Sequence, residues 1–411
     1  MLAFNVVALF NNKARLGLQG RKNIFNKITR HPLNSNQQLV WIHCASLGEF
    51  EQGRPVLEAL KKQYANINVV LTFFSASGYE AMKNYKGADQ IIYLPFDSKA
   101  NAIKMLDTLN PTLVLWVKYE FWFHYLNEMK RRDIPVLLIS GIFRASHPFF
   151  KWYGGLWRKI LQCFTHIFVQ NEISKNLVDS LSVQKNVSIT GDTRFDRVIE
   201  IAENFVPLPL IEKFCGDHKI LVAGSTWEDD EAELIHYVRA NPQMKFIIAP
   251  HEIDAGNLLD VQKEFTNAIL YSALITEPPS TINDTNLKPN VLIIDNVGML
   301  SRLYYYADIT YVGGAFGADG VHNVLEAAVY GKPVIYGPEF EKFSEAIDLI
   351  NCGGGITIEN ALELESTLNE FWQNNELLIS TGEAAKNYVF SNAGASNKIM
   401  AFIQEKRLLI N

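Results

Sequence analysis

The chain has 411 residues, with 38 Lys and Arg against 44 Asp and Glu and a formal net charge of −6. This length exceeds one ordinary hydrophobic core and predicts two domains of about 200 residues each. The globular composition and mild negative charge argue against a disordered chain and against a nucleic-acid partner. The four cysteines are far apart and form no C-x-x-C pair, which predicts reduced thiols and neither a disulfide framework nor a zinc site.

Residues 1–30 are predicted to be a leader that associates with a membrane. Residues 1–10 are almost wholly apolar, and six Lys and Arg residues follow before residue 31, whereas the first acidic residue is Glu49. A ten-residue apolar helix covers only about half of a bilayer core and cannot span it. An apolar tip followed by basic residues is typical of an interfacial anchor on an anionic membrane surface. The alternative is a first core element with a solvated basic flank.

Seven apolar runs separated by segments of helical length follow the leader. Such strands predict a parallel sheet with helices on both faces, that is, a doubly wound α/β domain over residues 31–205. Helices are expected at residues 54–64 and 78–85. The segment 147–159, in which aromatic and basic residues alternate, is a second candidate for membrane contact, with core packing as the alternative. The runs are QLVWIHCAS, NVVLTFFS, IIYLPF, TLVLWV, VLLIS, HIFVQ and VSITG.

The strand signals thin out over residues 202–219, where we expect the domain boundary, and then restart. The second domain, residues 206–411, is predicted to be doubly wound as well, and two such domains facing each other predict a cleft between them. Its last helix, residues 383–406, is a candidate to cross back to the first domain. Further helices are expected at residues 228–239, 299–306 and 324–330. The predicted strands are KILVAGS, KFIIAPHE, AILYS, NVLIID, ITYV and PVIYG.

Three motifs at strand ends of the first domain carry candidate chemistry, because ligands bind beyond the carboxyl ends of parallel strands. Ser46, Gly48 and Glu49 follow the first strand, where Gly48 allows close approach and Glu49 is placed to act as a general base; a helix-start glutamate is the alternative. Glu120, between aromatic residues, is a candidate for orienting an acceptor, or else marks a solvated helix start. Arg194 can bind a phosphate or carboxylate, with a surface ion pair to Asp196 as the alternative.

The second domain contains three comparable motifs. Small residues after the strand KILVA, and a glycine-rich loop followed by a capped helix, are candidate anion-binding turns. Asn323 and Glu326 have the spacing of a capping box, although Glu326 can instead bind a ribose diol. His251 is a candidate for binding a phosphate or a base edge, with a structural histidine as the alternative. The histidines form no H-x-x-x-H pattern, so no metal is expected.

In this order the motifs resemble those of the 3-deoxy-D-manno-octulosonic acid (Kdo) transferases of lipopolysaccharide assembly. The resemblance runs from residue 41 to about residue 355. Two departures are Lys118, at a position where an acid is common in the family, and the segment PHEID, which lacks an arginine. The matching segments are WIHCASLGE, WVKYEFW, ITGDTRFD, GSTWEDDE and GGAFGADGVHNVLEAAVYGKPVIYGP.

The resemblance implies the two-domain glycosyltransferase fold called GT-B and an inverting reaction without metal or cofactor. The donor would be CMP-Kdo, and the acceptor a lipid A precursor at the cytoplasmic face of the bacterial inner membrane. Glu49 would be the catalytic base. Alternatives are another GT-B enzyme that uses a UDP sugar, as a transferase or an epimerase, and a catalytically silent binding protein. The implied acceptor-binding residues are Ser46, Gly48, Glu120 and Arg194, and the implied donor-binding residues are Gly224, Ser225, Thr226, Pro250, His251, Gly313, Gly314, His322, Asn323 and Glu326.

Overall fold

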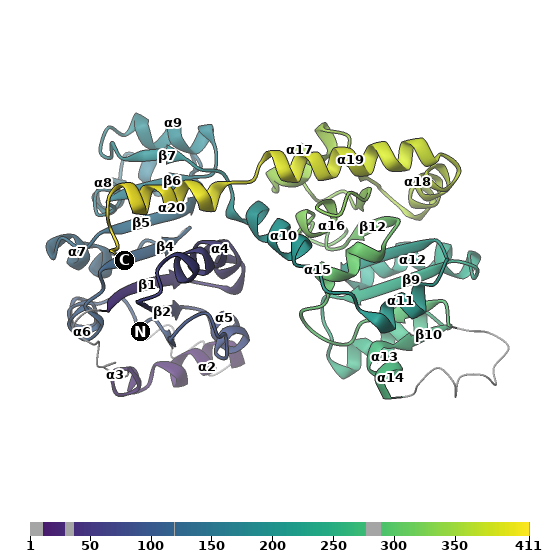
Figure 1. Cartoon of the computed structure of the whole chain (residues 1–411), viewed down its shortest axis with the longest axis horizontal. Helices are drawn as coiled ribbons and strands as arrows, with labels where there is room; N and C mark the ends of the chain where they lie inside the picture. Colours follow the sequence, from purple (N-terminus) through teal and green to yellow (C-terminus); the bar gives the residue numbers. More distant parts are fainter. Residues whose placement is uncertain (1–10, 29–36, 119, 277–288, 411) are drawn as a thin grey trace. The chain divides into compact units, whose positions relative to one another are not determined.

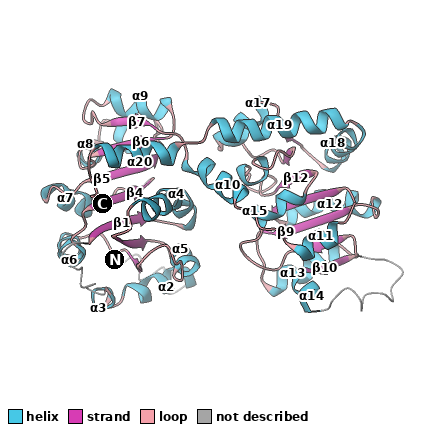
Figure 2. Ribbon diagram, viewed as in Figure 1, coloured by secondary structure: helices cyan, strands magenta, loops and turns pink. Residues whose placement is uncertain are grey.

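The computed structural model describes residues 11–28, 37–118, 120–276 and 289–410, and divides them into two compact units (Figure 1). The N-terminal unit contains the residues up to Arg197 and those from Ala393 onward, and the C-terminal unit runs from Val198 to Asn392. The first crossing between the units lies inside helix α10 (Thr193–Glu203). Each unit is an α/β body in which helices pack on a sheet (Figure 2).

In the described part of the N-terminal unit, seven parallel strands form one sheet, and all seven apolar runs predicted for this region are strands of it. The strands stand in the order β3, β2, β1, β4, β5, β6, β7, so β1 lies between β2 and β4. In this spatial order they are β3 (Gln90–Tyr93), β2 (Ile67–Phe73), β1 (Gln38–Cys44), β4 (Leu113–Val117), β5 (Val136–Gly141), β6 (His166–Val169) and β7 (Val187–Ile189).

Helices cover both faces of this sheet because its strands are apolar on both sides. In β1, Val40 and Ile42 pack into one core with helices α4 and α20, whereas Leu39 and Trp41 pack into a second core with helices α6 and α7. The helices of the unit are α2 (Asn12–Arg21), α3 (Ile24–Lys27), α4 (Leu47–Gln63), α5 (Ala76–Met82), α6 (Lys99–Leu109), α7 (Phe123–Arg131), η1 (Pro148–Phe150), α8 (Gly155–Leu161), α9 (Glu172–Ser180) and α20 (Ala395–Glu405).

The described part of the C-terminal unit also has a seven-stranded parallel sheet. Its six predicted strands are confirmed, and the seventh, β14, was not predicted, because it is three residues long and directly follows two glycines. In spatial order the strands are β10 (Ala268–Leu270), β11 (Val291–Ile293), β9 (Lys245–Pro250), β8 (Ile220–Thr226), β12 (Ile309–Val312), β13 (Val334–Tyr336) and β14 (Gly355–Thr357). The helices are α11 (Pro209–Cys215), α12 (Glu228–Ala240), α13 (Ala255–Glu264), α14 (Tyr271–Thr276), α15 (Leu300–Leu303), η2 (Tyr304–Tyr306), α16 (Leu325–Ala328), α17 (Ser344–Asn351), α18 (Ala361–Gln373) and α19 (Asn375–Ser391).

The two largest errors in the predicted helix boundaries concern α4 and the final helix. Helix α4 begins at Leu47 and not at residue 54, because the Ser46 hydroxyl caps it by accepting a hydrogen bond from the backbone N–H of Glu49. The predicted final helix over residues 383–406 is two helices, because Gly394 adopts a φ of 100° between α19 and α20. As a result, α19 belongs to the C-terminal unit, whereas α20 lies against α4 of the N-terminal unit.

The described part of the leader packs onto the N-terminal unit. Arg21 is buried, and its guanidinium donates to the carbonyl oxygens of Leu94 and Phe74 at 2.7 and 2.6 Å and lies over three aromatic rings. Ile24 and Ile28 are buried in the core that also contains Leu39 and Trp41. Residues 1–10 and 29–30 of the predicted leader lie outside the described residues. In the part of the chain that the structure describes, we find no helix with the length and apolarity needed to cross a bilayer.

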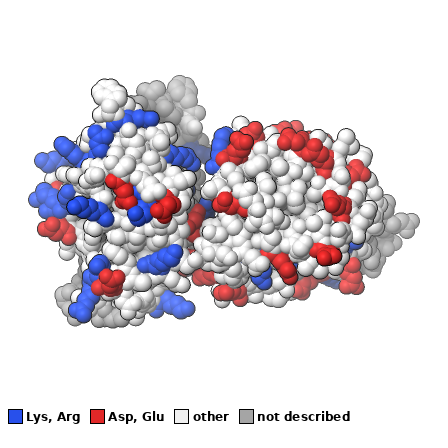
Figure 3. Space-filling model, turned by 90° about the horizontal axis from the view of Figure 1, so that it is seen from above, with Lys and Arg blue, Asp and Glu red and all other residues white. Residues whose placement is uncertain are grey.

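Charge is divided unequally between the units. The N-terminal unit contains 28 of the 38 Lys and Arg residues but only 15 of the 44 Asp and Glu residues, and the C-terminal unit contains the other 10 and 29. Figure 3 shows basic side chains gathered over the N-terminal unit and acidic ones over the C-terminal unit. The small net charge of the chain is therefore the sum of a basic N-terminal unit and an acidic C-terminal unit. The positive charge of the N-terminal unit favours anionic partners.

The attachment of α20 gives a first testable prediction. The Asp196 carboxylate accepts hydrogen bonds from the backbone N–H groups of Gly394 and Ser396 at 2.5 and 2.6 Å, at the start of α20. Asp196→Ala should therefore lower the free energy of unfolding by about 1–2 kcal/mol, measured by urea denaturation.

Asp107→Ala is the matched control, because Asp107 is an exposed partner of Arg132 and should contribute about 0.5 kcal/mol. Equal losses for the two variants would show that Asp196 does not anchor the helix.

Candidate active site

The carboxyl ends of β1 and β4 form the switch point of the N-terminal sheet, where successive strands are added on opposite sides. Sheets of this kind bind ligands in the crevice beyond such a point. Glu49 follows β1 in the first turn of α4, and Glu120 follows β4. The topology therefore brings the two predicted carboxylates to the same place, although 71 residues separate them in the sequence.

Glu49 is nearly buried, with 9% of its surface exposed. Its carboxylate accepts a hydrogen bond from the backbone N–H of Ala45. Burial, and then the nearby charge of Glu120, raise the pKa of Glu49 to about 7, while the N–H groups of Ala45 and Ser46 and the charge of Lys118 act in the opposite direction. A carboxylate with this pKa is suited to accept a proton near neutral pH.

Glu120 is positioned by groups that the sequence analysis did not single out. Its carboxylate lies 3.6 Å from Nε2 of His43, a fully buried residue of β1. His43 Nδ1 lies 2.8 Å from Oγ1 of Thr72, and the His43 ring packs against Trp116, whose indole N–H donates to the backbone carbonyl of Glu120. The available signal was a histidine inside the otherwise apolar strand QLVWIHC.

Two cations meet at Gln52 of α4, and the charge of one of them, Lys118, acts on Glu49. With its amide oxygen turned toward them, the buried Gln52 accepts hydrogen bonds from Lys118 Nζ and Arg194 Nε, both at 3.3 Å. The Arg194 guanidinium also binds the Asp192 carboxylate, at 2.7 Å from Nη2. Lys118 has a φ of 62°, a strained conformation for a residue with a side chain, at the very end of β4. Basic and acidic groups thus share one edge of the sheet.

The corresponding point of the C-terminal sheet is the carboxyl end of β8, which lies between β9 and β12. The loops after β8 and β12 approach closely: a Cβ atom on Gly313 would lie 2.5 Å from the carbonyl oxygen of Ser225, and Gly314 has a φ of 96°. Ser225 has a φ of 54°. Only glycine fits at positions 313 and 314. The absence of side chains there allows the backbone after β12 to pack directly against the backbone at the end of β8.

Asp230, which lies in the helix predicted at residues 228–239 and was not singled out, joins these two loops. Its fully buried carboxylate accepts hydrogen bonds from the N–H groups of Trp227 and Gly314, at 2.9 and 2.8 Å, and from the hydroxyl of Tyr311 at 2.7 Å. The predicted residues Gly224, Thr226 and Pro250 end β8 and β9 beside them. One buried carboxylate thus accepts hydrogen bonds from both loops and from β12.

His251 and His322 come together at this edge with Trp227, which was not predicted. His251 stacks on Trp227 and on His322, with ring centroids 4.6 and 4.5 Å apart, and the Trp227 indole N–H donates to Nε2 of His322 at 3.0 Å. Burial, and then the neighbouring His251, lower the pKa of His322 to about 4. His322 is therefore neutral at physiological pH.

Asn323 and Glu326 lie around a helix that is shorter than predicted. Helix α16 has four residues and not the seven expected for residues 324–330. Asn323 Oδ1 accepts from the backbone N–H of Leu325 at 3.3 Å, and its Nδ2 donates to the Glu326 carboxylate at 2.9 Å. The predicted capping box is therefore not formed: the residue before α16 is Val324, and Glu326 accepts from the side chain of Asn323 and not from its backbone N–H. In so short a helix the contribution of a helix dipole is reduced.

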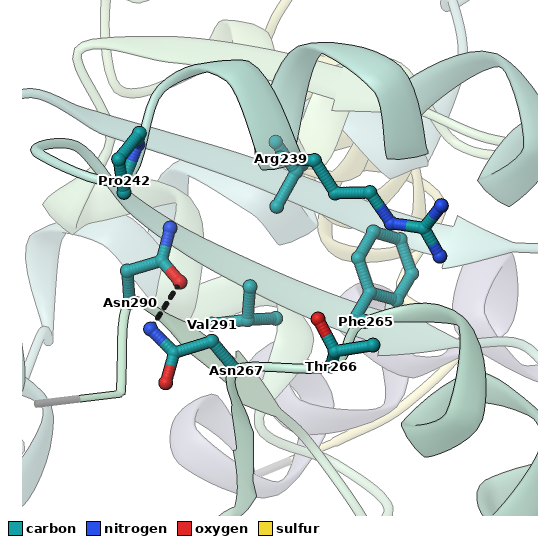
Figure 4. Close-up of a pocket in the computed structure, with 8 residues that line it drawn as sticks. Arg239, Pro242, Phe265, Thr266, Asn267, Asn290 and Val291 are labelled. Atoms are coloured by element: carbon teal, nitrogen blue, oxygen red, sulfur yellow. Dashed lines mark hydrogen bonds between the residues drawn. The ribbon is translucent and has the colours of Figure 1, made fainter. Parts of the chain in front are cut away.

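Two other features bear on the site. Among the described residues, no group of three or more His, Cys, Asp or Glu side chains is arranged to hold a metal ion. A pocket of about 340 Å³, lined by residues that include Arg239, Asn267 and Asn290, lies at the amino-terminal ends of β10 and β11 (Figure 4). No predicted site residue lines this pocket, so it is separate from the candidate site.

Comparison with solved structures defines the class of the fold. The chain superposes on UDP-GlcNAc 2-epimerase from Neisseria meningitidis, bound to UDP-GlcNAc, with a TM-score of 0.64 and 17% identity, covering 90% of this chain and 100% of that one. Together with the two parallel-sheet units, this confirms the predicted GT-B fold. At this identity the likeness concerns the fold alone.

Sequence comparisons point to one family with this fold. Residues 15–197 match the family model described as 3-deoxy-D-manno-octulosonic-acid transferase (kdotransferase). The chain is 25% identical over 394 residues to the 3-deoxy-D-manno-octulosonic acid transferase of Haemophilus influenzae, covering 89% of this chain and 87% of the relative. It is 27% identical over 391 residues to a bifunctional glycosyltransferase/methyltransferase of Fusobacterium nucleatum, covering 87% of this chain but only 58% of the relative's length. These matches confirm the resemblance to the Kdo transferase family and support a glycosyltransferase.

The raised pKa of Glu49 gives a prediction that does not depend on activity. Native Glu49 keeps its proton up to about pH 7, whereas the unfolded chain loses it near 4.5, so native stability falls as pH rises between these values. Glu49→Gln should remove this loss. Between pH 4 and pH 8, the free energy of unfolding of the variant should therefore rise by up to about 3 kcal/mol relative to that of wild type.

Urea unfolding of both proteins at several pH values measures this difference. Glu80→Gln, which removes an exposed carboxylate, is the control for the change in net charge. A difference between wild type and Glu49→Gln that stays constant with pH would contradict the assignment.

Proposed function

We propose that the protein is an inverting glycosyltransferase that moves Kdo from CMP-Kdo to a hydroxyl of a lipid A precursor, with Glu49 as the general base. The observation that carries the proposal is the buried Glu49 carboxylate, with a pKa near 7, at the switch point of a sheet whose sequence matches the Kdo transferase family. Neither a metal nor a cofactor is part of the proposed reaction.

In the proposed reaction, the ionised Glu49 carboxylate accepts the proton of the acceptor hydroxyl. The hydroxyl oxygen forms a bond to the anomeric carbon of Kdo as the bond from that carbon to the CMP phosphate breaks, with CMP leaving as an anion. Attack from the face opposite the phosphate inverts the anomeric centre. Glu120 supports this role because its charge keeps Glu49 basic enough to accept a proton near neutral pH.

The acceptor would lie at the N-terminal site. A lipid A precursor carries phosphates, and Lys118 and Arg194, which share Gln52, are suited to bind an anionic group there. Ser46 and Gly48 form the turn into α4 next to the base. The excess of basic residues in this unit supports the same partner, because it attracts anionic lipid.

The donor would lie at the C-terminal site. At this site the Ser225 hydroxyl would donate to the CMP phosphate. The Thr226 hydroxyl donates to Glu231, and the N–H groups of Trp227 and Gly314 donate to Asp230, so these groups shape the site around the donor. Gly313 and Gly314 allow the two chain segments to pack backbone against backbone. The Glu326 carboxylate, which accepts a hydrogen bond from the Asn323 side chain, would accept hydrogen bonds from the ribose hydroxyls.

Because the proposed acceptor is a lipid, the proposal includes contact of the protein with the cytoplasmic face of the bacterial inner membrane. In the segment 147–159, Phe149 is buried, but Trp152, Tyr153 and Leu156 are 92%, 58% and 53% exposed. Lys151, Arg158 and Lys159 lie in the same segment. Exposed aromatic residues beside cations suit the headgroup region of an anionic bilayer.

The direct test is transfer by the purified protein, with CMP-Kdo generated in place, a lipid A precursor, and parallel reactions with and without EDTA. Kdo-modified lipid in both tubes is the expected result. A parallel reaction with UDP-GlcNAc tests the alternative of a UDP-sugar enzyme, and turnover of UDP-GlcNAc without transfer of Kdo would overturn the proposal. CMP binding without any product would indicate a silent binding protein.

Glu49→Gln should lower kcat for transfer by a factor of about 10²–10⁴ while changing CMP affinity less than twofold, because Glu49 lies in the N-terminal unit and every proposed CMP contact lies in the C-terminal unit. Single-turnover rates and CMP titration calorimetry measure the two effects. Glu51→Gln, two residues along the same helix, is the matched control. An equal loss of CMP affinity in Glu49→Gln would contradict its assignment as the base.

Changing Trp152, Tyr153 and Leu156 together to Ser should weaken binding to phosphatidylglycerol vesicles at least about tenfold, because their apolar surface would no longer enter the bilayer. Vesicle co-sedimentation at low and high salt measures this. Leu362→Ser, at a residue 78% exposed in the C-terminal unit, is the control. Unchanged partitioning of the triple variant would show that this segment does not touch the membrane. Deletion of the leader is a poorer test, because it removes the buried Arg21.

A further inference from the structure

Trp227, His251 and His322 form one aromatic cluster at the carboxyl edge of the C-terminal sheet. Trp227 directly follows β8, His251 follows β9, and His322 lies on the loop after β12. The rings of Trp227 and His322 are 15° from parallel and joined edge to edge by the bond from Nε1 to Nε2, and His251 stacks across both. Three neighbouring strands thus each contribute one ring to the cluster.

The bond between Trp227 and His322 has only one possible direction. An indole N–H is a donor and has no acceptor atom, so Nε2 of His322 must be unprotonated. A neutral imidazole without a proton on Nε2 carries it on Nδ1, and imidazolium cannot accept this bond at all. Trp227 therefore selects one of the three protonation states open to a histidine.

The position of His322 is fixed as well. Its backbone N–H donates to the carbonyl oxygen of Gly313 at 3.0 Å. A Cβ atom on Gly314 would lie 2.7 Å from Cδ2 of His322 and 3.0 Å from Nε2, so this edge of the ring rests on the glycine loop. With Nε2 occupied by Trp227, Nδ1–H is the one ring group left that can donate a hydrogen bond to a ligand.

We propose that Trp227 is a positioning residue of the nucleotide-sugar site: it holds His322 as the neutral Nδ1–H tautomer, which donates a hydrogen bond to an anionic oxygen of the bound nucleotide sugar. The ligand part of this inference rests on the proposed function, whereas the tautomer is a property of the protein alone. His322 then acts as an uncharged donor, and its contribution does not vary with pH across the neutral range.

The surroundings of His322 agree with this assignment. Besides burial, the groups that influence the pKa of His322 are His251, which lowers it, and Asp319, which raises it. Burial and His251 outweigh Asp319, and the pKa falls to about 4. A hydrogen bond that only the neutral ring can accept lowers the pKa further in the same direction.

The experiment is NMR of the full-length, unliganded protein labelled with ¹⁵N-histidine, in which long-range proton–nitrogen correlations distinguish the two tautomers and imidazolium. His322 is assigned by comparison with His322→Gln. Wild type should show the Nδ1–H pattern from pH 6 to pH 8. Trp227→Phe, which keeps a ring but has no N–H, should shift the equilibrium toward Nε2–H and raise the pKa of His322.

His251→Ala provides a second variant that removes stacking but keeps the hydrogen bond, so His322 should remain in the Nδ1–H form. Trp152→Phe is a control for replacing an indole elsewhere in the chain. An Nε2–H or imidazolium pattern in wild type at pH 7, or no change in Trp227→Phe, would overturn the tautomer assignment.

CMP titration of the same samples separates this inference from the proposed function. A weaker affinity for CMP in Trp227→Phe, with a change in the Nδ1 signal of wild type on saturation, is expected. If wild type shows the Nδ1–H pattern but does not bind CMP, CMP-Kdo is not the donor. The role of Trp227 in fixing the tautomer would then still stand. An unaltered Nδ1 signal in wild type saturated with CMP would refute a hydrogen bond from Nδ1–H to the CMP portion.

Discussion

The candidate site of the N-terminal unit depends on one electrostatic constraint, the burial of the Glu49 carboxylate near the charge of Glu120. Burial away from water, and then the charge of Glu120, disfavour the ionisation of Glu49. Backbone N–H groups at the start of α4 and the charge of Lys118 offset part of this cost. The balance leaves Glu49 able to gain and lose a proton near pH 7, and it also makes this residue a source of instability at high pH.

A different solution holds the C-terminal site together. There a single buried carboxylate, Asp230, accepts three hydrogen bonds and joins the loops after β8 and β12. All three donors belong to the protein itself, so Asp230 organises the site and is not free to act as a base. This division suits a reaction in which one unit supplies the base and the other holds the departing phosphate.

The strands were predictable because most of their sequences are nearly continuous apolar runs that alternate with segments of helical length, the pattern of a parallel sheet buried on both faces. The position of Glu49 at a strand end followed from the same pattern. Helix ends were predicted less well: Ser46 caps α4, but Pro55 inside the helix obscures its true start. The break between α19 and α20 had a local signal in Asn392 and Gly394, which the sequence analysis did not use. Residues whose role lies in long-range contacts were missed altogether. His43 and Gln52 acquire partners only when β1, β4 and α10 come together, and Trp227 only when β12 returns beside β8.

The dependence of transfer rate on pH tests the central role of Glu49 most directly. If Glu49 is the base, kcat/KM for transfer should rise with pH through an apparent pKa near 7 and then level off, and Glu120→Gln should move this midpoint to lower pH. A rate that is flat between pH 5 and pH 9, or a midpoint that survives unchanged in Glu49→Gln, would show that another group takes the proton.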